Sequence, residues 1–198
     1  MTTNQQFLFA DEPPAQHQTN PDLPGWKVLI VDDEKEVHAV TRLSLMDVSF
    51  EQRGLAFLSA YSRAEAEQLV SEHHDIALIL LDVVMDTDDA GLKVTEFVRN
   101  TVKNQFVRIV LRTGQPGQAP ERAVVMHYDI NDYKAKTELT SQKLFTVVMS
   151  ALRSYRDIMR VEQQRQQLEQ QLEQVLQQLH DDYPAAYQQV TAGLSEEP

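Results

Sequence analysis

The sequence contains no cysteine, and basic residues are scarce. Without thiols the chain has no disulfide framework, no thiolate metal site and no cysteine nucleophile. Only 18 Lys and Arg stand against 30 Asp and Glu, which gives a formal net charge of −12. Such acidity opposes binding to the phosphate backbone of nucleic acids. We therefore expect no nucleic-acid partner.

Long apolar runs and a basic leader are also missing. Residues 1–6 carry no basic region, and no apolar run approaches the length that crosses a bilayer. We therefore expect a cytoplasmic protein without a membrane partner. At 198 residues the chain is long enough for one ordinary domain with extensions.

The two ends of the chain have the composition of tails. Residues 1–25 are polar and rich in proline, as flexible segments are. The apolar stretch Phe7-Leu8-Phe9 interrupts this tail, and the sequence leaves open whether it packs on the domain or docks onto a partner. Residues 183–198 are acidic and are expected to be poorly ordered.

Between the tails, the apolar pattern alternates between strand and helix spacing. Short apolar runs predict strands at residues 28–31, 55–61, 75–82, 106–111 and 130–134. Helical spacing follows each of the first four runs, and a final helix follows the fifth. This alternation predicts an α/β fold for residues 26–150, with a flavodoxin-like, doubly wound sheet of five parallel strands and an extended C-terminal helix.

One predicted strand, residues 75–82, ends on the carboxylate of Asp82. A buried, unpaired carboxylate is costly and needs a hydrogen-bond donor or a cation. Polar side chains also end three other strands: Asp32-Asp33-Glu34, Arg112-Thr113-Gly114, and Lys134 with Lys136. These ends meet at one edge of the sheet, where carboxylates favour Mg²⁺ and a lysine and a hydroxyl can neutralise phosphoryl oxygens. We interpret Asp82 as a nucleophile that becomes an aspartyl-phosphate.

With these residues in this order, the region 26–150 resembles a response-regulator receiver domain of two-component signalling. The segments that carry the resemblance are Val31-Asp32-Asp33-Glu34, Leu80-Leu81-Asp82 with Met85 and Gly91, Thr113, and Asp132-Tyr133-Lys134-Ala135-Lys136. The resemblance implies Mg²⁺ as the cofactor and a histidine kinase or phosphotransfer protein as the phosphoryl donor.

The resemblance also implies a role for each site residue. Asp82 would be the phosphoacceptor; Asp32, Asp33, Asp82 and the backbone carbonyl of Val84 would hold Mg²⁺; Lys136, Thr113 and Tyr133 would serve catalysis and switching. Lys136 is preferred to Lys134 because the family's lysine stands three residues after the switch aromatic. Thr113 and Tyr133 would move together on activation.

Two features set this chain apart within the resemblance. Asp86 replaces the proline that usually follows Met85, and one extra residue lies between Asp82 and Gly91, so this loop is expected to be reshaped and more acidic. The chain also looks like receivers that precede larger output modules in proteins tied to cyclic di-GMP turnover. No cyclase or phosphodiesterase signature follows residue 150, so we expect a chain that is not an enzyme.

A heptad pattern runs through the last helix and predicts a coiled coil over residues 151–182. One core position holds Leu144, Ala151, Ile158, Arg165, Leu172 and Leu179, and the other holds Val147, Ser154, Val161, Leu168 and Val175. This alternation of three and four residues is the seam of a coiled coil, and a polar Arg165 in it sets register at a cost in stability. A homodimer is the expected product.

The first hypothesis is a response regulator that signals through dimerisation or a downstream protein bound by its coiled coil. A constitutive coiled-coil scaffold with an unused site is the main alternative. Another is an auxiliary phosphatase that places Gln171 or Gln178 in the site of a second receiver. Metal dependence separates the first two hypotheses, and loss of phosphate from a second receiver reveals the third.

Overall fold

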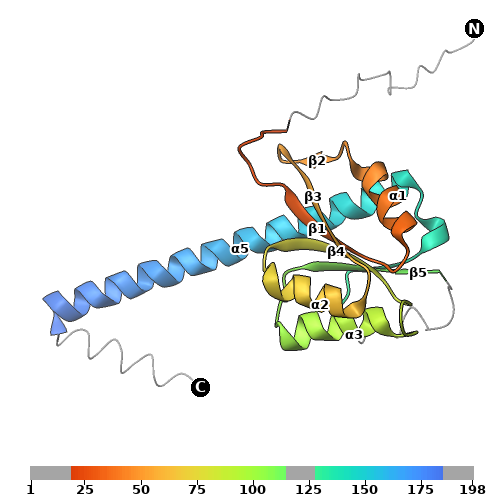
Figure 1. Cartoon of the computed structure of the whole chain (residues 1–198). Coiled ribbons are helices and arrows are strands. Elements are labelled where there is room, and N and C mark those ends of the chain that lie inside the picture. Colours follow the sequence, from red (N-terminus) through yellow and green to blue (C-terminus); the bar gives the residue numbers. More distant parts are fainter. Residues whose placement is uncertain (1–18, 115–127, 185–198) are drawn as a thin grey trace, which may run out of the picture. The chain divides into compact units, whose positions relative to one another are not determined.

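The computed structural model describes residues 19–114 and 128–184 and forms a sheet with helices on both faces (Figure 1). The Phe7-Leu8-Phe9 stretch, residues 115–127 and most of the acidic tail lie outside the described residues. The chain divides into two compact units, residues 1–153 and 154–198. The predicted limits of the four segments stay a prediction.

The sheet has six strands in the order β2-β3-β1-β4-β5-β6. The strands are β1 Trp26–Val31, β2 Ser49–Phe50, β3 Arg53–Ala60, β4 Ile76–Asp82, β5 Arg108–Thr113 and β6 Asp132–Ala135. The helices are α1 Lys35–Leu45, α2 Arg63–Glu72, α3 Ala90–Glu96 and α5 Ser141–Asp182, with a π-helical turn at Phe97–Thr101 and a 3-10 turn at Lys136–Glu138. All neighbouring strands are parallel except β2 and β3. The predicted α/β fold is confirmed, with one strand more than predicted.

Alternate residues of the central strands feed apolar layers on both faces of the sheet. Leu29, Ile79 and Leu81 pack in a buried cluster with Val94 of α3. The residues between them point to the opposite face, because side chains alternate along a strand. Every residue of β4 is buried, as a central strand of a parallel sheet requires.

The strand that was not predicted, β2, belongs to a hairpin with a two-residue turn that the sequence does not signal. Glu51 and Gln52 form its turn with φ angles of 51° and 62°. A turn with two positive φ angles usually contains Asn-Gly or Asp-Gly, so this pair gives no hairpin signal. The hairpin is held by Trp26, whose indole Nε1 donates to the Phe50 carbonyl at 2.9 Å.

Helix α1 buries polar side chains and exposes apolar ones. His38 and Thr41 are buried, whereas Val40 and Leu43 are 62% and 70% exposed. The reason is the position of the helix beside the polar end of β1, where His38 Nε2 donates to the Asp32 carbonyl at 2.7 Å. Leu45, at the end of the helix, is buried on the same inner face, so only part of the apolar pattern of α1 faces the core.

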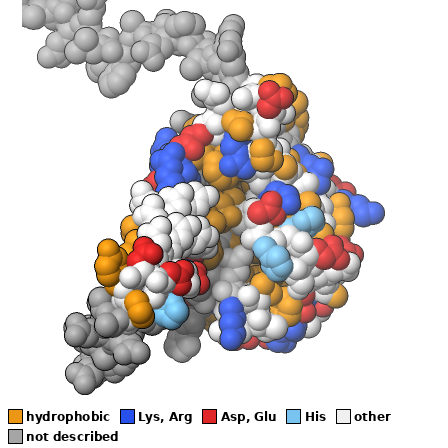
Figure 2. All heavy atoms as spheres, turned by 90° about the vertical axis from the view of Figure 1, so that its left-hand side faces the viewer, with side chains coloured by type: hydrophobic (Ala, Val, Ile, Leu, Met, Phe, Trp, Pro, Cys, Tyr) orange, Lys and Arg blue, Asp and Glu red, His pale blue; other side chains and the backbone are white. Residues whose placement is uncertain are grey.

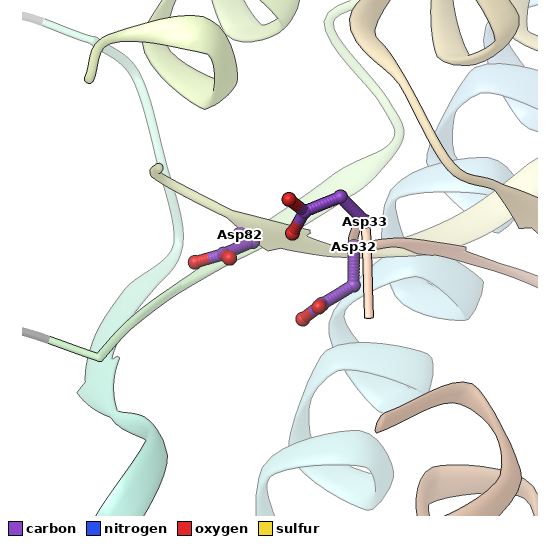
Figure 3. A group of neighbouring side chains, drawn as sticks. All are labelled: Asp32, Asp33 and Asp82. Carbon is purple, nitrogen blue, oxygen red and sulfur yellow. The ribbon is translucent and has the colours of Figure 1, made fainter. Parts of the chain in front are cut away.

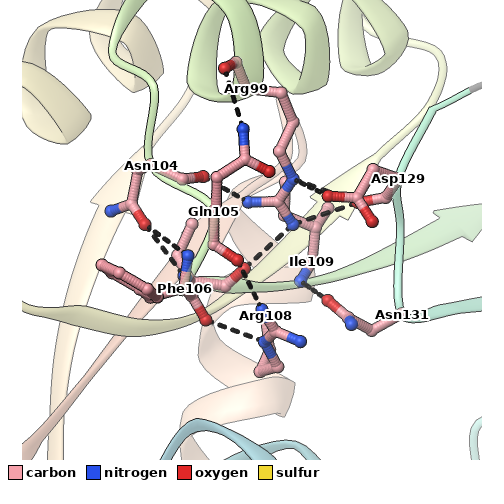
Figure 4. Close-up of polar contacts among 9 residues, drawn as sticks. Arg99, Asn104, Gln105, Phe106, Arg108, Ile109, Asp129 and Asn131 are labelled. Atoms are coloured by element: carbon pink, nitrogen blue, oxygen red, sulfur yellow. Dashed lines mark hydrogen bonds and ion pairs between the residues drawn. The ribbon is translucent and has the colours of Figure 1, made fainter. Parts of the chain in front are cut away.

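At the amino-terminal edge of β5, a buried arginine joins three chain segments (Figure 4). Arg99 donates to the carbonyls of Asn104, Val107 and Asp129 at 2.6 to 3.1 Å, and its Nε lies 3.0 Å from an Asp129 carboxylate oxygen. The side chain of Asn104 accepts from the amides of Phe106 and Val107. These amides therefore cannot enter the ladder, and β5 begins at Arg108 instead of the predicted residue 106.

Helix α5 covers most of the heptad pattern in one continuous element. Leu144 and Ala151 are buried in the folded chain. Further along, the seam is open, because Val161, Leu168, Leu172 and Val175 are 57% to 66% exposed. None of the described helices has the length and apolarity needed to cross a membrane. On the face that Figure 2 shows, acidic and basic side chains are mixed.

Candidate functional site

Three aspartates from two neighbouring strands meet at the carboxyl edge of the sheet (Figure 3). Asp82 is the last residue of β4, and Asp32 and Asp33 follow β1 directly. Each contributes a carboxylate oxygen, and these oxygens lie within 4.8 Å of one another. Asp32 and Asp82 are buried, and Asp33 is exposed. The sheet therefore gathers like charges in a place where they repel one another unless cations are present.

Lys136 is the lysine that reaches these carboxylates. Its Nζ lies 2.9 Å from Asp82 Oδ2, 3.1 Å from Asp32 Oδ2 and 3.1 Å from Glu34 Oε1. Lys134 instead pairs with Asp132 at 2.9 Å, away from the site. Burial of Lys136 favours the neutral amine, but its ion pairs with Asp82 and Asp32 outweigh burial and raise its pKa. The ammonium is therefore fixed in the site at any physiological pH.

Asp82 is 3% exposed, and only one of its carboxylate oxygens has a donor in the described part of the chain. Lys136 occupies Oδ2, and Oδ1 is buried without a hydrogen-bond partner. Burial raises the pKa of Asp82, against the opposing pull of Lys136. An orphaned buried oxygen beside two further carboxylates is the donor set that a hard divalent cation takes. The residues present therefore fit Mg²⁺.

Gly91 allows the start of α3 to approach the backbone of Asp82. Its amide donates to the Val83 carbonyl at 3.0 Å. A Cβ at this position would lie 2.1 Å from the Asp82 carbonyl oxygen, which is far inside van der Waals contact. The loop between Val83 and Gly91, with its extra residue and Asp86, is therefore closed at its base by one hydrogen bond.

The two predicted switch residues lie on adjacent strands. Thr113 ends β5 and is buried, and Tyr133 in β6 is buried as well. Tyr133 pairs with Leu111, two residues before Thr113, so both side chains lie on the same face of the sheet. Their joint movement, and the role of the Val84 carbonyl, stay predictions.

Arg112 is a site residue to which the sequence assigned no role. It pairs with Asp82 in the β4–β5 ladder and is 3% exposed. Its NH2 group lies 3.4 Å from Asp32 Oδ2, and its NH1 group donates to Thr41 Oγ1 at 3.2 Å. The signal that could have revealed it was a charged residue inside an otherwise apolar strand, one position before the switch threonine.

A groove of about 380 Å³ lies beside the acidic cluster. Its walls come from α1 and from the segment that leads into α5, and Lys136 and Arg112 line it together with Val37, Val40, Leu139 and Leu144. The exposed apolar side chains of α1 therefore border the approach to the site.

Solved structures with the same fold are receiver domains. One is a CheY-like receiver domain protein from Methanospirillum hungatei, with a TM-score of 0.54 and 17% identity over 67% of this chain and 98% of that one. Another is the N-terminal domain of a response regulator/sensory box/GGDEF protein from Carboxydothermus hydrogenoformans, with a TM-score of 0.56 and 23% identity over 67% of this chain and 98% of that one. Both likenesses concern the fold.

A curated relative is similar in sequence as well. It is a 3'3'-cGAMP-specific phosphodiesterase 2 from Vibrio cholerae, 50% identical over 140 residues, which are 71% of this chain and 27% of the relative. The chain thus spans about a quarter of this relative. No family model matches the chain.

This relative contradicts the prediction of a chain without enzymatic function, because it carries the name of an enzyme. The prediction relied on the lack of a catalytic signature after residue 150, but the aligned region is only 27% of a much longer protein. A receiver sequence by itself holds no such signature, so its absence was uninformative. By its sheet topology and its similar structures, the chain contains a domain with the fold of response-regulator receiver domains.

Proposed function

We propose that the chain is a response regulator whose receiver domain is phosphorylated on Asp82 and controls the hydrolysis of a cyclic dinucleotide. The donor would be a histidine kinase or a phosphotransfer protein. The observation that carries the proposal is the buried Asp82 carboxylate, with one oxygen held by Lys136 and the other without a donor in the described structure. The dinucleotide rests on the named activity of the Vibrio relative.

The chemistry follows from the residues around Asp82. One carboxylate oxygen attacks the phosphorus of a phosphohistidine, the P–N bond breaks, and the imidazole leaves with its electron pair and takes a proton. Asp32, Asp33, Asp82 and the Val84 carbonyl would hold Mg²⁺, whose charge offsets the phosphoryl oxygens. Lys136 turns its Nζ from the carboxylate to a phosphoryl oxygen as the acyl phosphate forms. Thr113 then hydrogen-bonds the phosphoryl group, and Tyr133 follows it.

The groove beside the site supports docking of the donor. Val40 and Leu43 are exposed on α1, and Val40 also lines the groove that contains Lys136. A phosphohistidine on a helical surface would pack its apolar neighbours on these side chains while the imidazole enters the groove. We expect Leu43→Arg to slow transfer from the cognate phosphohistidine protein without slowing phosphorylation by acetyl phosphate.

Helix α5 is the proposed output element. Its exposed apolar stripe at Val161, Leu168, Leu172 and Val175 is the part of the predicted seam that is free to pair with a second chain. A parallel pair of such helices would give a cytoplasmic homodimer and pass the state of the receiver to a downstream protein or a phosphodiesterase unit. Leu144 and Ala151, the first residues of the seam, are used within the folded chain.

The test of phosphorylation compares the full chain with two variants. Wild type, Asp82→Ala and Asp86→Ala are incubated with acetyl phosphate and Mg²⁺, and intact mass and light scattering are recorded. We expect one phosphoryl group on wild type and on Asp86→Ala, none on Asp82→Ala, and a change in molar mass in solution on phosphorylation. If wild type stays unmodified and dimeric throughout, the switch is wrong and the constitutive scaffold takes its place.

The output is tested with a matched pair of helix variants. Leu168→Arg places a charge in the proposed seam, and Gln170→Arg places the same charge two residues away on the outer face. We expect Leu168→Arg alone to give monomers. A second experiment follows the hydrolysis of 3'3'-cGAMP and of cyclic di-GMP by wild type and Asp82→Ala, with and without acetyl phosphate. Equal rates for the two chains would contradict the proposed control of hydrolysis by Asp82.

A further inference from the structure

Arg112 is a buried cation that the phosphotransfer scheme leaves unused. Its guanidinium lies between β5 and α1, with Asp32 Oδ2 at 3.4 Å and Thr41 Oγ1 at 3.2 Å. Its Nε is buried and has no acceptor within the described residues. Burial lowers the pKa of this guanidinium, and the nearby charges of Asp32 and Asp82 oppose that shift. Arg112 is therefore held mainly by the charge of the acidic cluster.

A second arginine on the same strand shows what a structural role looks like. Arg108 lies four residues earlier on β5, on the same face of the sheet, and is also buried. Its Nε donates to the Phe106 carbonyl and its NH2 to the Gln105 carbonyl, both at 2.8 Å. Arg108 thus fastens local backbone. The contacts of Arg112 are longer and go to a carboxylate of the proposed metal site and to a hydroxyl.

We propose that Arg112 is a resident cation that partly neutralises Asp32 and thereby sets a low affinity of the acidic cluster for a divalent metal ion. The inference rests on the proposed metal site at Asp82. With Arg112 in place, three carboxylates face two cations, the half-buried Lys136 and the buried Arg112. A divalent ion on Asp32 must then bind a few ångströms from a fixed positive charge.

The size of the effect follows from Coulomb's law. A unit charge about 7 Å from a divalent ion, with the screening of bulk water, weakens binding about tenfold, and weaker screening in the protein enlarges the effect. Arg112 would therefore determine the Mg²⁺ concentration at which the receiver accepts phosphate. In the metal-free protein the same charge stabilises the buried Asp32.

The test is calorimetric titration of Mg²⁺ into the full chain. Arg112→Met removes the charge, Arg112→Gln removes it but keeps a hydrogen-bond donor, and Arg112→Lys keeps it. Arg108→Met is the matched control on the same strand and face. Circular dichroism checks that each variant is folded, and Arg112→Gln serves as the neutral variant if Arg112→Met is not.

We expect Kd for Mg²⁺ to fall at least about tenfold in Arg112→Met and Arg112→Gln, and to stay within about threefold of wild type in Arg112→Lys and Arg108→Met. Melting temperatures in EDTA and in Mg²⁺ give a second readout, since Mg²⁺ should raise Tm more in the neutral variants than in wild type. Equal or weaker Mg²⁺ binding by both neutral variants overturns the role of Arg112. If no chain binds Mg²⁺, the metal site of the proposed function is itself wrong.

Discussion

The two edges of the sheet treat buried charge in opposite ways. At the amino-terminal edge, Arg99 is 6% exposed and its guanidinium donates only to oxygens that need a donor, three backbone carbonyls and one carboxylate (Figure 4). At the carboxyl edge, three carboxylates converge (Figure 3). Among the described residues, both Asp82 Oδ1 and Arg112 Nε lack a hydrogen-bond partner there.

The two polar networks are expected to differ in their effect, one on the stability of the fold and the other on the chemistry of the site. A saturated network adds stability, because removing one member leaves several buried groups without partners. A network with unpaired polar atoms costs folding free energy, and it leaves those atoms available to a metal ion or a phosphoryl group. We therefore expect substitutions at the first edge to affect folding and substitutions at the second to affect phosphorylation.

The largest effect is expected for Arg99→Met. The change leaves the backbone carbonyls of Asn104, Val107 and Asp129 without their donor, and each buried acceptor left without one costs about 1–3 kcal/mol. Urea unfolding measures the loss, and acetyl phosphate labelling of the folded fraction should still occur. The matched control is Arg63→Met, whose solvent-exposed pair with Glu67 contributes little to stability. Equal losses of unfolding free energy in Arg99→Met and Arg63→Met would contradict the stabilising role of the Arg99 network.

A somewhat smaller effect is expected for Gly91→Ala. The new Cβ must displace the backbone of Asp82, and overpacking of this kind costs about 1–3 kcal/mol. Because the displaced residue is the proposed phosphoacceptor, labelling by acetyl phosphate should slow as well. Gly114→Ala is the control, since a Cβ there meets no atom of the described residues within 4 Å. Fast labelling of Gly91→Ala would show that the Asp82 position tolerates movement.

The smallest change in stability, with a reversed sign, is expected for Asp82→Asn. Burial raises the pKa of Asp82 in the folded chain, so its ionised form costs stability at any pH above that pKa. Replacing it by a neutral amide should raise the free energy of unfolding in EDTA at neutral pH, by less than the losses expected for the two variants above. In Mg²⁺ only wild type should gain stability. A variant less stable than wild type in EDTA would show that the Lys136 pair outweighs burial.

The sequence predicted the sheet because its signals are local and strong. Buried strands such as β4 are continuous apolar runs, and the polar residues Asp32, Asp82 and Lys136 stand directly at strand ends. The topology then brings these ends together without further information. The site residues could therefore be named before their distances were known.

The features that the sequence did not predict depend on contacts between distant segments. The β2 hairpin forms over Glu51 and Gln52 because Trp26, from another strand, fixes it. The face of α1 that turns inward is set by His38, whose Nε2 donates to the Asp32 carbonyl instead of facing solvent. The sequence placed Arg112 among the polar residues that end a strand, and only the β4–β5 register places it opposite Asp82.

If the phosphodonor docks on α1 as proposed, the exposed Val40 and Leu43 would let the domain change partners without refolding. Val40 and Leu43 are largely exposed and contribute little to the core, whereas His38 and Thr41 on the inner face hold groups next to Asp32 and Arg112. Substitutions on the outer face can therefore accumulate at small cost in folding free energy. A duplicated copy of the gene could become insulated from its original phosphodonor by a few outer-face changes, while its phosphorylation chemistry stayed intact.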